Sequence, residues 1–181
     1  TPLENKLASQ TDSSRIPSPF AQDEWSDKYA TAAEEMLKQL PRRTGFCLIL
    51  DNNLGRLAFE IAKRSDMKIY AVETDAAKVN ASRESLSKTG LYGNRIVVHQ
   101  YANNELPYSN YFADLIVSDE NVISDKMPFS PESIQRNLKP LGGTIVLRDG
   151  KFNEQITAND WFKKLGLSTD SPKKKGDYVK S

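Results

Sequence analysis

The sequence predicts a three-layer α/β/α domain built on a doubly wound, mainly parallel sheet. Two patterns predict it: five apolar runs of strand length recur along the chain, and segments with helical spacing separate most of them. Connections of a dozen or more residues return the chain to the same end of a sheet, so strands joined in this way run parallel. The 181 residues suffice for one domain of ordinary size and are cramped for two.

The chain begins with a polar stretch and then changes to a helical pattern. Residues 1–24 are rich in small polar side chains, contain Pro17 and Pro19, and carry little apolar surface to offset the entropy cost of ordering. We therefore expect a flexible leader over residues 1–24 and a folded domain over residues 25–181. From Trp25 onward, apolar residues recur at three- and four-residue spacing and predict one face of a helix that ends before Pro41; they are Tyr29, Ala33, Met36, Leu37 and Leu40.

Strands and helices then alternate along the domain. Apolar runs predict strands at residues 45–50, 68–72, 95–99, 113–118 and 143–147. Between them we expect a helix with an apolar face over residues 57–62 and a second helix that Asp75 caps. A third helix is expected to begin at Ser130 and to turn Ile134 and Leu138 inward.

The C-terminal part predicts one more helix and an edge hairpin. Thr157 and Asp160 resemble a capping pair, and Gly166 is suited to end the helix that they begin. Residues 165–168 and 177–180 are expected to form an antiparallel hairpin at the edge of the sheet.

Composition excludes several classes of function. Lys and Arg total 25 against 24 for Asp and Glu, so the charge predicts neither nucleic acid nor an anionic membrane as partner. The longest apolar run, residues 46–50, is far shorter than a membrane span, and no signal segment opens the chain. Because the chain starts at Thr1, we interpret it as a processed or trimmed soluble product, either cytoplasmic or exported after removal of a leader. The single Cys47 and single His99 predict no internal disulfide and no metal site.

The end of the first predicted strand is the first candidate binding segment, because ligands of open parallel sheets sit beyond the carboxyl ends of the strands. Residues 51–57, from Asp51 to Leu57, form the turn into the following helix and are expected to cradle a ligand. Gly55 permits a positive φ and close backbone approach, and Asn53 tolerates a left-handed conformation. Leu57 adds bulk where a further glycine often lies.

The ends of the other strands supply further candidates. Glu73 lies about 20 residues after the turn, where an acidic residue commonly accepts hydrogen bonds from ribose hydroxyls, although a polar strand end is the plainer interpretation. Asp75 is interpreted as the helix cap. Residues 100–104 are expected to flank a base. Asp119 and Glu120 follow the fourth strand, where either carboxylate is placed to orient a nucleophile, although carboxylates at strand ends more often face solvent.

Other reactive or aromatic residues are interpreted as structural. His99 falls within a strand and is expected to be a hydrogen-bonded structural histidine, and Cys47 within an apolar strand to be a buried hydrophobe. Tyr108, Tyr111 and Phe112 are expected to pack in the core rather than to shield a base.

The order of these pieces resembles class I S-adenosylmethionine-dependent methyltransferases, whose domains are Rossmann-like, over residues 25–181. The resemblance rests on GFCLILD at 45–51, GRLA at 55–58, VETD at 72–75, LP at 106–107, ADLIV at 113–117 and LKPLGGTIVL at 138–147. It implies a site for S-adenosylmethionine in which Asn53 and Gly55 lie along the methionine part, Glu73 meets the ribose, and Ala102 with Asn103 lies near the adenine.

The sequence also departs from this family. The family's turn usually has three glycines, whereas Asn53 and Leu57 occupy the outer two positions here. An acidic residue usually meets the adenine amino group, whereas this chain has Ala102, which removes a hydrogen bond of about 1 kcal/mol.

A narrower resemblance joins Trp25, GLYG at 90–93 and GDYVK at 176–180. It is to methyltransferase-like domains that precede a quinoprotein-like β-propeller in bacterial envelope proteins. It implies that the chain is part of a larger multidomain protein.

Three hypotheses about function are compatible with these patterns. The first is a domain that binds S-adenosylmethionine and transfers its methyl group to an unidentified small or protein-borne acceptor, with Asp119 as base or orienting residue. The second is a pseudoenzyme, a degenerate non-catalytic scaffold or interaction module, which the lost glycines and Ala102 favour. The third, a dinucleotide-dependent dehydrogenase, is disfavoured by the same missing glycines.

Overall fold

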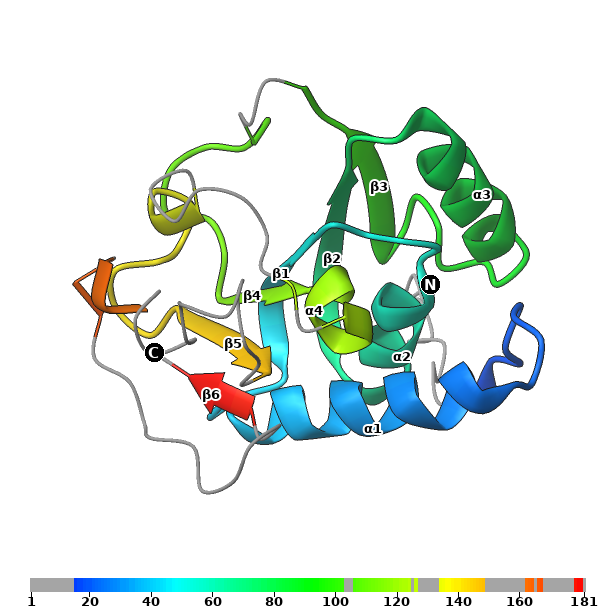
Figure 1. The fold of residues 1–181 in the computed structure, drawn as a ribbon, viewed down its shortest axis with the longest axis horizontal. Helices are drawn as coiled ribbons and strands as arrows, with labels where there is room; N and C mark the ends of the chain where they lie inside the picture. Colours follow the sequence, from blue (N-terminus) through cyan, green and yellow to red (C-terminus); the bar gives the residue numbers. More distant parts are fainter. Residues whose placement is uncertain are drawn as a thin grey trace, which may run out of the picture.

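The computed structural model describes residues 15–102, 106–124, 126, 134–148, 162–164, 166–167 and 178–180. In these ranges the strands form one sheet in the order β3-β2-β1-β4-β5-β6 (Figure 1). The strands are β1 (Thr44–Leu50), β2 (Asp66–Glu73), β3 (Ile96–Gln100), β4 (Leu115–Ser118), β5 (Thr144–Arg148) and β6 (Tyr178–Lys180). The helices are α1 (Glu24–Lys38), α2 (Arg56–Arg64), α3 (Ala76–Ser87) and α4 (Asp119–Ser124).

The sheet topology confirms the predicted doubly wound arrangement. β1 pairs in parallel with β2 on one side and with β4 on the other, β2 pairs in parallel with β3, and β4 with β5. The chain therefore reverses its direction of winding between β1 and β4, which is where open parallel sheets place ligands. β6 runs antiparallel to β5. The predicted hairpin partner, residues 165–168, lies partly outside the described residues, so the hairpin itself stays a prediction.

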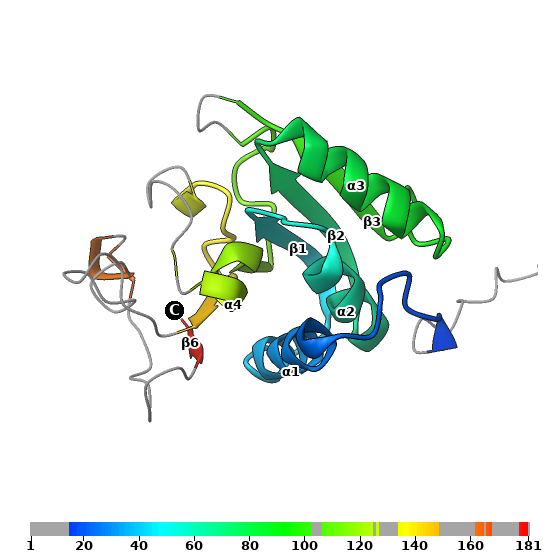
Figure 2. The same cartoon turned by 45° about the vertical axis from the view of Figure 1, so that its right-hand side comes forward.

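Side chains alternate between the two faces of the sheet with the period of two that strands impose. On one face Cys47 and Ile49 of β1 join a buried cluster with α1, α2 and α3. Figure 2 shows these three helices together on one side of β1 and β2. On the other face Leu48 and Leu50 join a second cluster that contains Ile134 and Leu138, as well as Phe162. The inward orientation predicted for Ile134 and Leu138 is confirmed, since they are buried.

Helix starts follow the predicted capping chemistry. The Asp75 carboxylate accepts a hydrogen bond from the Ala77 amide at 2.8 Å and caps α3, as expected. Asp23 caps α1 together with Ser26 in a reciprocal capping box. Asp23 also binds Arg56, the first residue of α2, through both carboxylate oxygens at 2.9 and 2.7 Å. The start of α1 is thus fixed to the start of α2.

The proposed leader of residues 1–24 stays a prediction, and residues 1–14 lie outside the described ranges. In its described part, Ile16 and Phe20 pack against the first buried cluster, and the Phe20 ring meets Phe59 edge to face at 6.0 Å between centroids. Contacts with the domain therefore extend to residues before Trp25.

Two local features differ from the sequence analysis. The short helix α4 begins at Asp119, directly after β4, where only a strand end was expected. Tyr111 is 58% exposed, whereas Tyr108 and Phe112 pack against the second cluster, so the expected core role holds for only two of the three aromatics. No helix in the described ranges is long and apolar enough to cross a bilayer.

Candidate functional site

The carboxyl ends of β1, β2, β3 and β4 lie at one edge of the sheet and bring the candidate residues together. Backbone hydrogen bonds join these ends: the Asn52 amide donates to the Val72 carbonyl at 2.9 Å, and the Tyr101 amide to the Glu73 carbonyl at 3.1 Å. A long contact of 3.5 Å from Ser118 Oγ to Asp51 Oδ2 links the ends of β4 and β1. The strand pairing therefore gathers these segments around one edge.

The turn after β1 keeps part of the geometry of a ligand-binding turn. Asp51 has φ 50° and Gly55 has φ 84°, so the backbone is left-handed at both positions. Gly55 is the N-cap of α2 and none of the described side chains caps that helix, which leaves amide groups available at its start. A Cβ at Gly55 would lie 3.0 Å from Leu86 Cδ1, so close packing against α3 also requires glycine here.

Leu57, at one of the two missing-glycine positions, and Asn52, directly before the other, are both buried. Leu57 is completely buried in the cluster under α2, so its side chain fills the core and is not exposed to a ligand at the turn. Asn52 is also completely buried, and its Nδ2 donates to Ser82 Oγ at 2.9 Å. Its Oδ1 atom has no hydrogen-bond partner among the described residues. A buried amide oxygen in this state is uncommon and costs stability.

Glu73 ends β2 with one carboxylate oxygen engaged and the other turned toward a lysine. Oε1 accepts hydrogen bonds from the Thr74 amide at 2.7 Å, the Thr74 hydroxyl at 3.2 Å and the Asp75 amide at 3.0 Å. Oε2 lies 3.9 Å from Lys78 Nζ. The carboxylate is thus held in place by its own turn through one oxygen, which leaves Oε2 as the atom for a ligand.

The electrostatics of this edge are dominated by closely placed carboxyl groups. Burial, together with the nearby charges of Glu73 and Glu120, raises the pKa of Asp51 to about 6, although the Ser118 hydroxyl and Lys78 oppose the shift. Asp51 therefore titrates close to neutral pH.

Asp119 is buried to a degree that the sequence does not indicate. Its carboxyl group is completely buried, and Oδ1 accepts a hydrogen bond from the Tyr29 hydroxyl of α1 at 2.6 Å. Oδ2 has no hydrogen-bond partner in the described part of the chain. Burial raises the pKa of Asp119 to about 7, even though the Tyr29 hydroxyl and the Asn53 amide favour the charged form. Burial and the charge of Asp119 also raise the pKa of Tyr29.

The segment after β3 is described only in part. Ala102 is exposed, and Asn103 lies outside the described residues. Tyr101 belongs to this segment, but the sequence predicts no role for it; it is 7% exposed and belongs to the second buried cluster. The hydrogen bond of Tyr29 to Asp119 was likewise not predicted, because the helical pattern places Tyr29 only on an apolar face. The one available signal is that a buried tyrosine hydroxyl needs a polar partner.

His99 and Cys47 have the structural surroundings that were expected for them. His99 Nδ1 lies 2.8 Å from the Tyr108 hydroxyl in a hydrogen bond, and Cys47 is completely buried, which raises the pKa of its thiol. Within the described ranges, no group of three or more metal-ligating side chains is placed to hold an ion.

Comparison with known proteins identifies the fold. No family model matches the sequence, and no curated protein matches it either. Among solved structures, a protein of Methanococcus maripaludis assigned as an S-adenosylmethionine-dependent methyltransferase is 25% identical, with a TM-score of 0.60 over 67% of this chain and 55% of that one. A methyltransferase dependent on the same cofactor from Aquifex aeolicus is 18% identical, with a TM-score of 0.62 over 86% of this chain and 95% of that one.

The fold alone does not determine the reaction. The cyclase SpnF is 15% identical, with a TM-score of 0.59 over 78% of this chain and 60% of that one. The chain thus spans little more than half the length of the Methanococcus protein and all but a small part of the Aquifex protein. The narrower resemblance to domains that precede a β-propeller stays a prediction. The parallel sheet, its strand order and these structural matches show that the chain folds as a class I S-adenosylmethionine-dependent methyltransferase-like domain.

Proposed function

We propose that this domain binds S-adenosylmethionine across the carboxyl ends of β1, β2 and β3 and transfers a methyl group to a nucleophile on a small molecule or a protein. The observation that carries the proposal is the fixed carboxylate of Glu73, a residue only 6% exposed, whose Oε1 is held by the Thr74 and Asp75 amides while Oε2 has only the 3.9 Å ion pair with Lys78 Nζ. A carboxylate held in this way at the end of the second strand is suited to accept hydrogen bonds from ribose hydroxyls.

The remaining roles follow the geometry of the turn. Asp51, Asn53 and Gly55 would line the methionine part, where the uncapped start of α2 offers amide groups. Ala102 and Asn103 would lie near the adenine. When bound, the cofactor supplies a methyl group that its sulfonium has already activated, so the protein has mainly to hold the acceptor in line.

The proposed site fits S-adenosylmethionine better beside β1 and β2 than at the β3 end, where the adenine would lie. Three observations support a polar ligand beside β1 and β2. They are the left-handed backbone at Asp51 and Gly55, the Oε2 of Glu73 with only a 3.9 Å pair to Lys78, and the Oδ1 of Asn52, which lacks a partner among the described residues. At the β3 end, Ala102 offers no side-chain acceptor for an adenine amino group. The proposal therefore predicts weaker binding than a site with a carboxylate there would give.

Asp119 remains our proposal for the base or orienting residue. Its carboxyl group is buried against Tyr29, so contact with an acceptor requires Tyr29 to release it. The raised pKa, about 7, gives Asp119 the proton affinity of a general base at neutral pH.

Calorimetry with S-adenosylhomocysteine tests the binding site directly. The wild-type chain should release heat and gain thermal stability on binding, because a ligand that binds only the folded state stabilises it. Glu73→Gln should weaken binding at least tenfold, since it removes a charged hydrogen-bond acceptor for the ribose, an interaction of about 1.5–3 kcal/mol.

Glu84→Gln is the matched control for this experiment. Glu84 lies on α3, is 76% exposed in its side chain and pairs with Lys88 on the same helix, so the substitution should leave the affinity unchanged. Absence of both heat and a thermal shift at millimolar ligand would refute the proposed site.

The second candidate function is a non-catalytic scaffold, and the burial of both Leu57 and Asp119 favours it. A variant that restores family residues separates the two. Leu57→Gly is unsuitable because removing a completely buried leucine costs roughly 3–5 kcal/mol. The double variant Asn53→Gly, Ala102→Asp avoids the core. Binding that appears only in this variant would identify the natural domain as degenerate.

A further inference from the structure

Tyr101 directly precedes Ala102, which we assign to the adenine, although no role follows from its own place in the sequence. It comes directly after β3, and its backbone amide is hydrogen-bonded to the Glu73 carbonyl at 3.1 Å. The residue is therefore fixed beside the end of β2, next to the carboxylate that we assign to the ribose.

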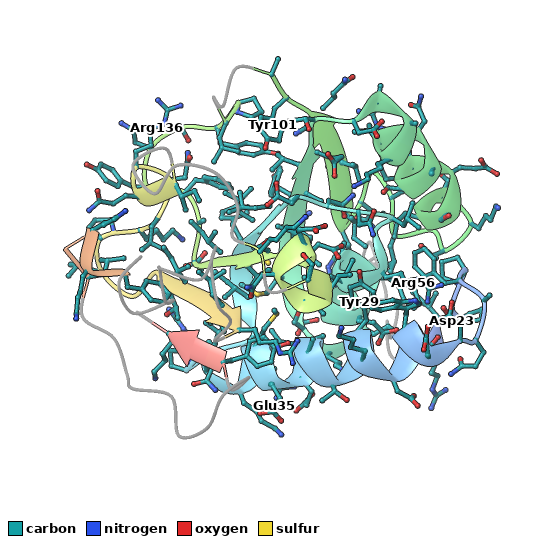
Figure 3. All side chains as sticks on the ribbon, in the orientation of Figure 1. Asp23, Tyr29, Glu35, Arg56, Tyr101 and Arg136 are labelled. Atoms are coloured by element: carbon teal, nitrogen blue, oxygen red, sulfur yellow. The ribbon has the colours of Figure 1, made fainter. Side chains whose placement is uncertain are left out.

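The Tyr101 ring is packed inward and is only 7% exposed. It belongs to the buried cluster that contains Leu50 and Val72, the residues that end β1 and precede Glu73 in β2. Figure 3 shows its side chain turned away from α3, toward the side of the sheet where β1 and β4 lie. The ring thus lies over the ends of the two strands that would hold the ribose.

The hydroxyl end of Tyr101 lies in the field of the two carboxylates of the site. Burial raises the pKa of Tyr101, and the charges of Asp51 and Glu73 raise it further. Both carboxylates are residues that we assign to the cofactor. The Tyr101 hydroxyl and the proposed ligand would therefore both lie near the carboxylates of Asp51 and Glu73.

A buried ring is poorly suited to act as a stacking platform for a base. A platform has to present one open ring face to the incoming base, because stacking needs face-to-face or offset contact. The Tyr101 ring is instead already covered on nearly all of its surface. The Tyr101 side chain therefore fills space within the proposed site and does not offer a ring face for a base to stack on.

We propose that Tyr101 is a gate that occupies the nucleoside half of the site and must leave its buried position before an adenine nucleoside can enter. This inference rests on the proposed cofactor site. With Tyr101 buried, the conformation that accepts the ligand is a minor state. The apparent dissociation constant then equals the intrinsic dissociation constant divided by the fraction of molecules in that state.

The test is the dissociation constant of S-adenosylhomocysteine, measured by calorimetry for the wild type and for Tyr101→Ala. Removing the ring should tighten binding at least tenfold, because the site is then permanently open. Tyr101→Leu is the second variant: it keeps apolar bulk for the cluster, lacks the outer part of the ring, and should also bind more tightly. Thermal unfolding without ligand shows whether each variant is folded.

Tyr111→Ala is the matched control, since Tyr111 lies in the same connection to β4 but is 58% exposed. Its affinity should equal that of the wild type. Combining Tyr101→Ala with Glu73→Gln should return the affinity to about that of the wild type, because the gain from opening the site and the loss of the ribose contact add as free energies.

The outcomes separate this inference from the proposed function. If the wild type binds and both Tyr101 variants bind equally well or more weakly, the gate proposal is wrong and the cofactor-site proposal is retained. Weaker binding by the variants would identify Tyr101 as a stacking surface. If neither the wild type nor any folded variant binds at millimolar ligand, the cofactor site is wrong and the gate falls with it.

Discussion

Glu73 and Asp119 occupy equivalent positions on the two sides of the central strand, and both are buried, yet their carboxyl groups have different hydrogen-bond partners. β2 and β4 both pair with β1; Glu73 is the last residue of β2, and Asp119 comes directly after the last residue of β4. Glu73 has one oxygen bonded to its own turn and one facing a partly exposed lysine. Asp119 is completely buried, with one oxygen on Tyr29 and one without a partner in the described ranges.

The difference arises from the element that succeeds each strand. After β2 the chain makes a turn before α3, and the turn amides of Thr74 and Asp75 bind one oxygen of the Glu73 carboxylate, a residue that is only 6% exposed. After β4 the helix α4 begins at once at Asp119, beneath α1. Position at a strand end therefore places a carboxylate near the site, but the next element decides which groups bind that carboxylate.

The largest effect expected from this contrast is a pH dependence of stability. The pKa of Asp119 is about 7 in the folded protein, against about 4 in an unfolded chain. Between these values the folded state binds more protons than the unfolded state, so stability falls as pH rises from 4 to 7. A difference of about three pH units corresponds to roughly 4 kcal/mol. Asp119→Asn, which cannot titrate, should become more stable than the wild type by this amount over that window in urea unfolding.

A matched substitution at an exposed carboxylate controls for general charge effects. Asp66→Asn, at the exposed start of β2, should follow the wild-type pH profile. Parallel profiles for Asp119→Asn and the wild type would show that Asp119 is ionised in the folded protein throughout.

The next largest effect concerns the partner of Asp119. Tyr29→Phe removes the hydroxyl that binds Oδ1 and deprives the buried carboxyl group of this side-chain donor. We expect the free energy of unfolding to fall by about 1–3 kcal/mol, the cost of an unsatisfied buried polar group. The loss should be greater at pH 8 than at pH 5, because the charged carboxylate depends more on its hydrogen bond.

Tyr92→Phe provides the comparison for this prediction. Tyr92 is a partly buried tyrosine that packs against the same cluster as Tyr29, so loss of its hydroxyl should change stability by no more than about 0.5 kcal/mol. Equal losses in the two variants would show that the contact between Tyr29 and Asp119 contributes nothing specific.

Local patterns were sufficient to predict most of the fold. The apolar run at residues 45–50 became β1, Asp75 became the cap of α3, and the long connections made the strands parallel. These features depend on short-range spacing and on capping chemistry, which a single sequence carries. The position of Glu73 at the edge of the sheet followed from the same reasoning.

The chemistry of the site was less predictable because it depends on contacts between distant segments. Tyr29 and Asp119 are 90 residues apart, and their hydrogen bond exists only because α1 packs over α4. The helical spacing of Tyr29 correctly predicted burial but could not identify the partner of its hydroxyl. The inward turn of Tyr101 likewise depends on packing against the ends of β1 and β2.

The smallest expected effect is on the Glu73 side of the comparison. Glu73→Gln keeps an amide oxygen that can still accept from Thr74 and Asp75, and loses only the charge that strengthens these bonds and the loose 3.9 Å pair with Lys78. We expect the free energy of unfolding to fall by about 1 kcal/mol or less, with no change of sign between pH 5 and pH 8. A larger loss of stability would mean that the Glu73 carboxylate mainly holds the start of α3. A variant that preserves the cap of α3 would then be needed to test Oε2 as a ligand contact separately.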